Sequence, residues 1–129
     1  MMQHRQLVLV VMGAVTWFLA AMLIRFTLPL GWLAGGPITL ALFAITVPFG
    51  ALGIEGAHRM VKGDPKRVMN TAVIISLVGL MLDGIAFVWA SQLYTGDRSD
   101  LWQGGAWLLW TVGTVLAYAA IRDARTATA

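Results

Sequence analysis

The sequence contains no cysteine, and only 12% of its residues carry a charge. The absence of cysteine excludes disulfides, thiolate nucleophiles and cysteine-ligated zinc or iron–sulfur sites. The scarcity of charge argues against an ordinary soluble domain, in which roughly a quarter of the residues are charged. Hydrophobic residues instead make up 59% of the chain. This composition predicts a protein that lies in a lipid bilayer.

Motifs for catalysis and for nucleic-acid binding are also missing. The chain has no HExxH sequence, no phosphate-binding loop and no nucleophile–base arrangement. Its net charge of +3 comes from basic residues at the ends of apolar segments, which form no stripe that could follow phosphates. His4 and His58 lie outside the apolar runs, with no facing ligand at the same depth. We therefore expect no enzyme activity, no cofactor, no metal site and no nucleic-acid partner.

What the sequence does contain is four long apolar runs. Each can cross a hydrocarbon core, which takes roughly 20 helical residues. The expected spans are 6–28, 37–58, 68–93 and 101–121. The first run is longer than the apolar core of a signal peptide, and no polar mature start follows it, so we interpret it as an uncleaved span. The predicted fold is an all-α membrane protein: a single domain, 1–129, with four transmembrane helices in an antiparallel bundle.

The basic residues predict the orientation of these helices. Only Arg25 and Arg98 fall at the ends that would face outward, and the other basic residues flank the termini and the second connection. The positive-inside rule therefore places both termini in the cytoplasm, in the cytoplasmic (inner) membrane of a bacterium. Tyr94 would belong to an aromatic belt at the outer surface. The residues predicted to lie inside are Arg5, Arg59, Lys62, Lys66, Arg67, Arg122 and Arg125.

The second connection is expected to be tight. Gly63 is a favourable residue just after a helix, and Asp64 followed by Pro65 is typical of a cap and a first-turn proline. The second and third helices would then be joined by about two residues and be antiparallel neighbours. The third helix would begin at Pro65 and end near Tyr94.

The polar residues around this connection have simple interpretations. His58 is expected to be solvated at a helix end, and Glu55 and Arg59 to form a salt bridge on the helix surface. Pro48 should kink the second helix, as a static bend or as a hinge. The tail from Arg122 onward is expected to fray.

Small residues recur along the helices at spacings of three and four. In the third helix they form a heptad seam that also contains Asp83, and the fourth helix repeats the pattern. Such seams are typical of helix–helix contacts in membranes. The residues expected to pack in this way include Ser76, Gly79, Ala86, Gly113, Gly50 and Gly53.

Asp83 is the most informative single residue, because a carboxylate near the middle of a span is expensive and usually functional. Its position on the seam predicts that it faces the bundle. The residues proposed to surround it, as hydrogen-bond donors or, for the arginine, as an ion-pair partner, are Trp17, Trp110, Thr111, Thr114 and Arg25. Asp83 could be a neutral acid that bonds one helix to another. Alternatively, it could exchange protons or bind a cationic substrate.

Three stretches resemble a bacterial family of four-span membrane proteins known as a domain of unknown function. They are TWFLAAMLIRF in the first helix, GLMLDGIAF around Asp83, and AWLLWTVGTVLAYA in the fourth helix. The resemblance implies the four-helix fold and no particular activity. The small multidrug-resistance transporters are also similar in length and span number. Their functional glutamate lies in the first helix, where this chain has no acid, so that assignment is disfavoured.

Two classes of function remain. The first is an accessory or structural membrane component, packed against a larger membrane-protein partner or against copies of itself. The second is a small proton-coupled transporter that works as an oligomer, with Asp83 as its intramembrane proton or cation site. In both, the lipid bilayer surrounds the chain.

Overall fold

The structure is a computed structural model that describes residues 2–128, with the side chains of residues 3–127. Every regular element in this range is helical. The four α-helices are long and apolar enough to cross a membrane. This confirms the prediction of an all-α chain with four helices of membrane-spanning length. The elements are α1 (Met2–Thr27), α2 (Pro37–Met60), α3 (Val68–Trp89), the short 3-10 helices η1 (Ser91–Leu93) and η2 (Arg98–Asp100), and α4 (Leu101–Thr128).

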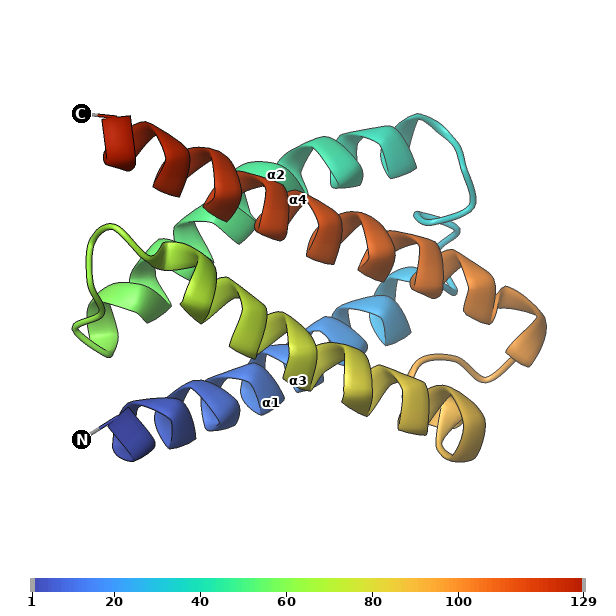
Figure 1. The fold of residues 1–129 in the computed structure, drawn as a ribbon. Helices are drawn as coiled ribbons and strands as arrows, with labels where there is room; N and C mark the ends of the chain where they lie inside the picture. Colours follow the sequence, from blue (N-terminus) through green and yellow to red (C-terminus); the bar gives the residue numbers. More distant parts are fainter. Residues whose placement is uncertain (1, 129) are drawn as a thin grey trace.

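The helices associate as two pairs that are not consecutive in sequence. α1 packs most extensively against α3, and α2 against α4, while α3 joins the pairs through α4 and, to a smaller extent, through α2. Figure 1 shows both termini and the 61–67 connection at one end, which we call the terminal end. The connections 28–36 and 90–100 lie at the opposite end, which we call the far end.

The third helix is shorter than the sequence predicted at both ends. It begins at Val68, and Asp64 and Pro65 precede it in a turn in which Asp64 Oδ1 accepts the Lys66 N–H at 3.0 Å. The Val68 and Met69 N–H groups are instead capped by Asp123 of α4, at 2.9 and 2.8 Å. The expected two-residue link is therefore wrong, because residues 61–67 separate α2 from α3. The cap comes from a distant helix, and local sequence does not reveal such a contact.

At its other end α3 stops at Trp89 because Ala90 leaves helical geometry, with φ −140° and ψ 40°. The chain then turns through η1 and carries Tyr94 back into the bundle, where its side chain is 0% exposed. Tyr94 is therefore buried between helices and is not part of a surface belt. Its ring meets Phe87 edge-on, with 4.7 Å between ring centroids.

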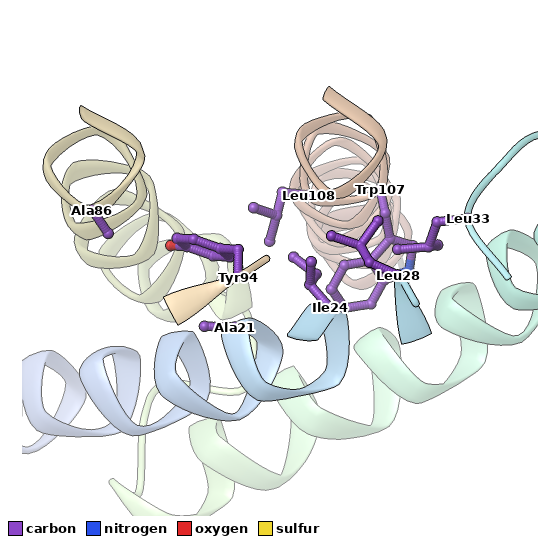
Figure 2. Close-up of a cluster of buried hydrophobic side chains, with 8 residues drawn as sticks. All are labelled: Ala21, Ile24, Leu28, Leu33, Ala86, Tyr94, Trp107 and Leu108. Atoms are coloured by element: carbon purple, nitrogen blue, oxygen red, sulfur yellow. The ribbon is translucent and has the colours of Figure 1, made fainter. Parts of the chain in front are cut away.

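Two apolar clusters hold the bundle together. One lies toward the far end and contains Ile24 of α1, Tyr94, and Trp107 and Leu108 of α4 (Figure 2). The other lies toward the terminal end and contains Val68 of α3 and Ala119 of α4. Between them lies a cavity lined by residues of all four helices, Asp83 among them.

Candidate functional site

Asp83 faces the interior of the bundle from the C-terminal half of α3. It shares this face with Ser76 and Ala86, and all three side chains are buried. The expectation that the acid points away from lipid follows from this periodicity, and the structure places it as expected. Asp83 itself is 9% exposed.

Two neutral donors share one oxygen of the Asp83 carboxylate. The Tyr94 hydroxyl donates to Oδ1 at 2.5 Å, and the Trp17 indole N–H donates to the same atom at 2.8 Å. The Trp17 N–H also lies 2.9 Å from the Tyr94 hydroxyl oxygen, which closes the three groups into a triangle. Because Trp17 belongs to α1 and Tyr94 to the chain after α3, the triangle fastens α1 to α3.

The second carboxylate oxygen, Oδ2, receives no hydrogen bond from the described residues. Every fully buried side-chain nitrogen or oxygen atom among those residues has a partner. Oδ2 is therefore not fully buried. Asp83 lines two hollows: a central cavity of about 230 Å³ between the helix pairs, and an open groove between α3 and α4.

The other residues predicted to surround Asp83 lie elsewhere. The Trp110 indole donates to the Phe43 carbonyl at 2.9 Å and stacks on the Phe43 ring. Arg25 donates to the Gln92 carbonyl at 2.5 Å on the surface of the far end, and so forms no ion pair with Asp83. The reason is geometric: Trp110 points toward α2, and the Arg25 side chain extends outward.

The two threonines bond within their own helix. The Thr111 hydroxyl donates to the Trp107 carbonyl at 2.8 Å, and the Thr114 hydroxyl donates to the Thr111 carbonyl at 3.0 Å. Of the two, Thr111 lines the central cavity with Asp83. Hydroxyls in apolar surroundings satisfy themselves on nearby backbone carbonyls, and neither therefore reaches the carboxylate.

The predicted packing glycines contribute unequally. A Cβ added at Gly50 would lie 2.9 Å from Val115 of α4, so the helices approach closely there. At Gly53, Gly79 and Gly113, no atom lies within 4 Å of an added Cβ. Gly53 and Gly79 instead border the central cavity.

Two further glycines, in α4 and α1, also lie close to a neighbouring helix. A Cβ at Gly104 of α4 would lie 2.8 Å from Ile24 of α1, and a Cβ at Gly13 of α1 would lie 3.0 Å from Val78 of α3. Which partner a glycine meets depends on the pairing of the helices, and a single-helix pattern does not contain that information.

A second polar cluster lies at the terminal end. Arg122 of α4 forms an ion pair with Glu55 of α2, with 2.7 Å between Nε and Oε1, and Tyr118 donates to the same oxygen at 2.8 Å. Arg122 also donates to the Pro65 carbonyl. The expected pair between Glu55 and Arg59 is therefore wrong, because α4 supplies the cation.

His58 is buried in this region, at 5% exposure. Its Nδ1 lies 2.6 Å from the Thr71 hydroxyl and its Nε2 lies 2.7 Å from the Asp64 carbonyl oxygen. It thus bridges α2, α3 and the connection between them, contrary to the expectation of a solvated residue. α4 continues to Thr128 because Arg122 and Asp123 are both held by neighbouring elements, so the tail does not fray from Arg122.

In the described part of the chain, no three His, Asp or Glu side chains come together as a metal site would require. No family model, no curated protein and no solved structure matches the chain. The resemblance to the four-span family of unknown function thus stays a prediction.

Proposed function

We propose that this chain is a multi-pass protein of the cytoplasmic membrane, without enzymatic activity, whose helices cross in alternating directions with both termini in the cytoplasm. The shared position of the termini supports this topology (Figure 1). So does the charge distribution, because the terminal end would carry most of the basic residues, as the positive-inside rule requires.

We further propose that the protein is a small transporter in which Asp83 exchanges a proton or a cation. The observation that supports this proposal is that the two oxygens of the Asp83 carboxylate have different hydrogen-bond partners. Oδ1 accepts both hydrogen bonds that join α1 to α3, whereas Oδ2 is open. A proton or cation on Oδ2 would leave both bonds in place, so the site could load and unload without loosening the bundle.

A second function, an accessory component packed against other subunits, is favoured by the surface of α2. Only 6% of its most apolar stretch is buried, compared with 28% for α3. Such a face suits lipid, a second copy of this chain or a larger membrane-protein partner. In this reading Asp83 serves only to fasten α1 to α3.

The two functions make different demands on the ionisation of Asp83. We propose to follow its carboxyl band by infrared spectroscopy while the pH around the protein in lipid nanodiscs is varied. Asp83→Asn keeps an oxygen where Oδ1 accepts its bonds but cannot ionise. Asp100→Asn, at the far end and outside both hollows, is the matched control.

For a transporter we expect a titrating carboxyl band that is lost in Asp83→Asn and kept in Asp100→Asn. In proteoliposomes, Asp83→Asn should also abolish proton movement driven by a pH gradient. If Asp83 stays in one protonation state between about pH 4 and pH 10, the transporter is excluded and the accessory role is supported.

A further inference from the structure

The central cavity lies between the α1–α3 pair and the α2–α4 pair, and all four helices line it. Its volume is about 230 Å³. An apolar protein cavity of about 150 Å³ holds a benzene molecule, so this one has room for a ring with a short chain attached. The walls are mostly apolar, with residues such as Met12, Ile54 and Leu108.

Few polar groups in this cavity are left to bind a ligand. The Trp17 N–H and the Thr111 hydroxyl line it but are already bonded within the protein. Asp83, Ser76 and Thr16 also line it, and the hydroxyls of Ser76 and Thr16 form no hydrogen bond to a described residue. The free polar groups are thus the carboxylate, which can only accept when ionised, and two hydroxyls, which can accept or donate. No cationic side chain lines the cavity.

The cavity opens toward the region between α1 and α2. These two helices touch only slightly, whereas each packs well against another partner. The lining residues on this side are exposed: Thr16 of α1, and Phe49 and Gly53 of α2, with Phe49 at 70%. Because these positions fall well within the membrane-length parts of both helices, a ligand would enter from the hydrocarbon region.

From these features we propose that the central cavity binds a small lipid-soluble amine, such as an aryl-alkylamine, whose protonated nitrogen donates to Asp83 Oδ2. The apolar walls accept the ring, and the cationic N–H group matches the open carboxylate oxygen. An anion or a neutral hydrocarbon lacks that match. This inference rests on the proposed role of Asp83 as an exchangeable site, since the neutral amine that enters from the hydrocarbon region takes the proton from Oδ2 and, as the ammonium, donates a hydrogen bond back to the carboxylate.

The experiment measures binding of 2-phenylethylamine to the full-length protein in lipid nanodiscs. Gly79→Leu places a side chain in the cavity without meeting other atoms at its Cβ, and leaves Asp83 intact. Gly84→Leu is the matched control, because Gly84 lies on the same helix, is equally open at its Cβ, and borders the α3–α4 groove and not the cavity. 2-Phenylethanol is the neutral comparison ligand.

We expect the wild type and Gly84→Leu to bind the amine alike, and Gly79→Leu and Asp83→Asn to bind it at least tenfold more weakly. The alcohol should also bind at least tenfold more weakly than the amine. If Gly79→Leu does not fold, as judged by circular dichroism and gel filtration, Gly53→Leu narrows the same cavity from α2 and should weaken binding in the same way.

Loss of binding in Gly84→Leu alone would move the ligand to the groove and overturn the proposal, and so would unchanged binding in Gly79→Leu or in Asp83→Asn. The infrared titration distinguishes failure of the amine-binding proposal from failure of the transporter proposal. A titrating Asp83 without amine binding refutes the amine and leaves the transporter standing. An Asp83 that does not titrate refutes the transporter itself.

Discussion

Asp83 in the middle of the bundle and Glu55 at its terminal end are held in similar ways, and the difference between them is a cation. Each carboxylate accepts a hydrogen bond from a tyrosine hydroxyl, at 2.5 Å from Tyr94 and 2.8 Å from Tyr118. Glu55 is then neutralised by Arg122 at 2.7 Å. The further donor to Asp83 among the described residues is a neutral indole.

This contrast is the basis for the proposal that Glu55 is structural and Asp83 exchangeable. A carboxylate that pairs with a cation from the same chain needs no further counter-charge, because its charge is balanced within the fold. A carboxylate that receives only neutral donors, in mostly apolar surroundings, must be balanced by a proton or by a ligand. Glu55 joins α2 to α4 with its charge balanced by Arg122, whereas the proposed exchange at Asp83 would use the oxygen that has no hydrogen-bond partner.

The largest expected effect comes from removing the cation of the terminal cluster. Arg122→Ala would leave Glu55 with only a neutral donor, the Tyr118 hydroxyl, as Asp83 has only neutral donors, and would free the Pro65 carbonyl. We expect the free energy of unfolding to fall by about 2 to 3 kcal/mol, because a partly buried charge loses its partner. Denaturation by SDS in mixed micelles, followed by circular dichroism, measures this change.

Arg59→Ala is the control for that experiment. Arg59 lies one helical turn from Glu55 but is exposed and forms no ion pair in the described structure. We expect its removal to cost less than about 0.5 kcal/mol. If the Arg59 variant lost more stability than the Arg122 variant, Glu55 would pair with Arg59 as the sequence predicted. The contrast between Glu55 and Asp83 would then be wrong.

A second prediction concerns the cap that closes the terminal end. Asp123→Ala would leave the Val68 and Met69 N–H groups without the carboxylate that caps them. Loss of a helix cap costs about 1 to 2 kcal/mol, and hydrogen exchange should increase first in the opening turn of α3. Asp123→Asn, which keeps one acceptor oxygen, should lose about half as much. Equal stability of the alanine variant and the wild type would mean that the Asp123 cap on α3 does not stabilise the terminal end.

The two regions were also unequally predictable from the sequence. The four helices follow from length and hydropathy, and the inward direction of Asp83 follows from the periodicity of α3. Depth made Trp17 a candidate donor together with Trp110, and only Trp17 contacts the acid. These are properties of single helices, and local sequence contains them.

The other contacts depend on how the chain folds back on itself. Tyr94 reaches Asp83 only because α3 ends at Trp89 and η1 reverses the chain, which no periodic pattern within α3 reveals. Arg122 and Asp123 reach α2 and α3 because α4 pairs with both, while their sequence context is that of a polar tail. Glu55 and Arg59 lie four residues apart in α2, and this spacing predicted a salt bridge between them. In the structure Glu55 instead pairs with Arg122 of α4.

A third prediction compares the bonds at Asp83 with its charge. Tyr94→Phe removes one donor to Oδ1 and should cost about 1 kcal/mol, which is typical of a hydrogen bond between membrane helices. Asp83→Asn keeps both donors satisfied and should cost less. The same micelle denaturation measures both variants. If Asp83→Asn were the more destabilising of the two, the charge itself would be structural and Asp83 would resemble Glu55.

The smallest effect is expected at Trp110, which the sequence placed beside Asp83 and the structure places against Phe43. Trp110→Phe removes its N–H bond to the Phe43 carbonyl but keeps an aromatic ring for the stack, and 42% of its side chain is exposed. We expect a loss of about 0.5 kcal/mol in stability and an unchanged infrared titration of Asp83. Trp17→Phe should perturb that titration, since its indole donates directly to the carboxylate. A shift in the Trp110 variant equal to that in the Trp17 variant would mean that α4 also reaches the acid, and that Asp83 has a fuller set of partners than its two donors on Oδ1.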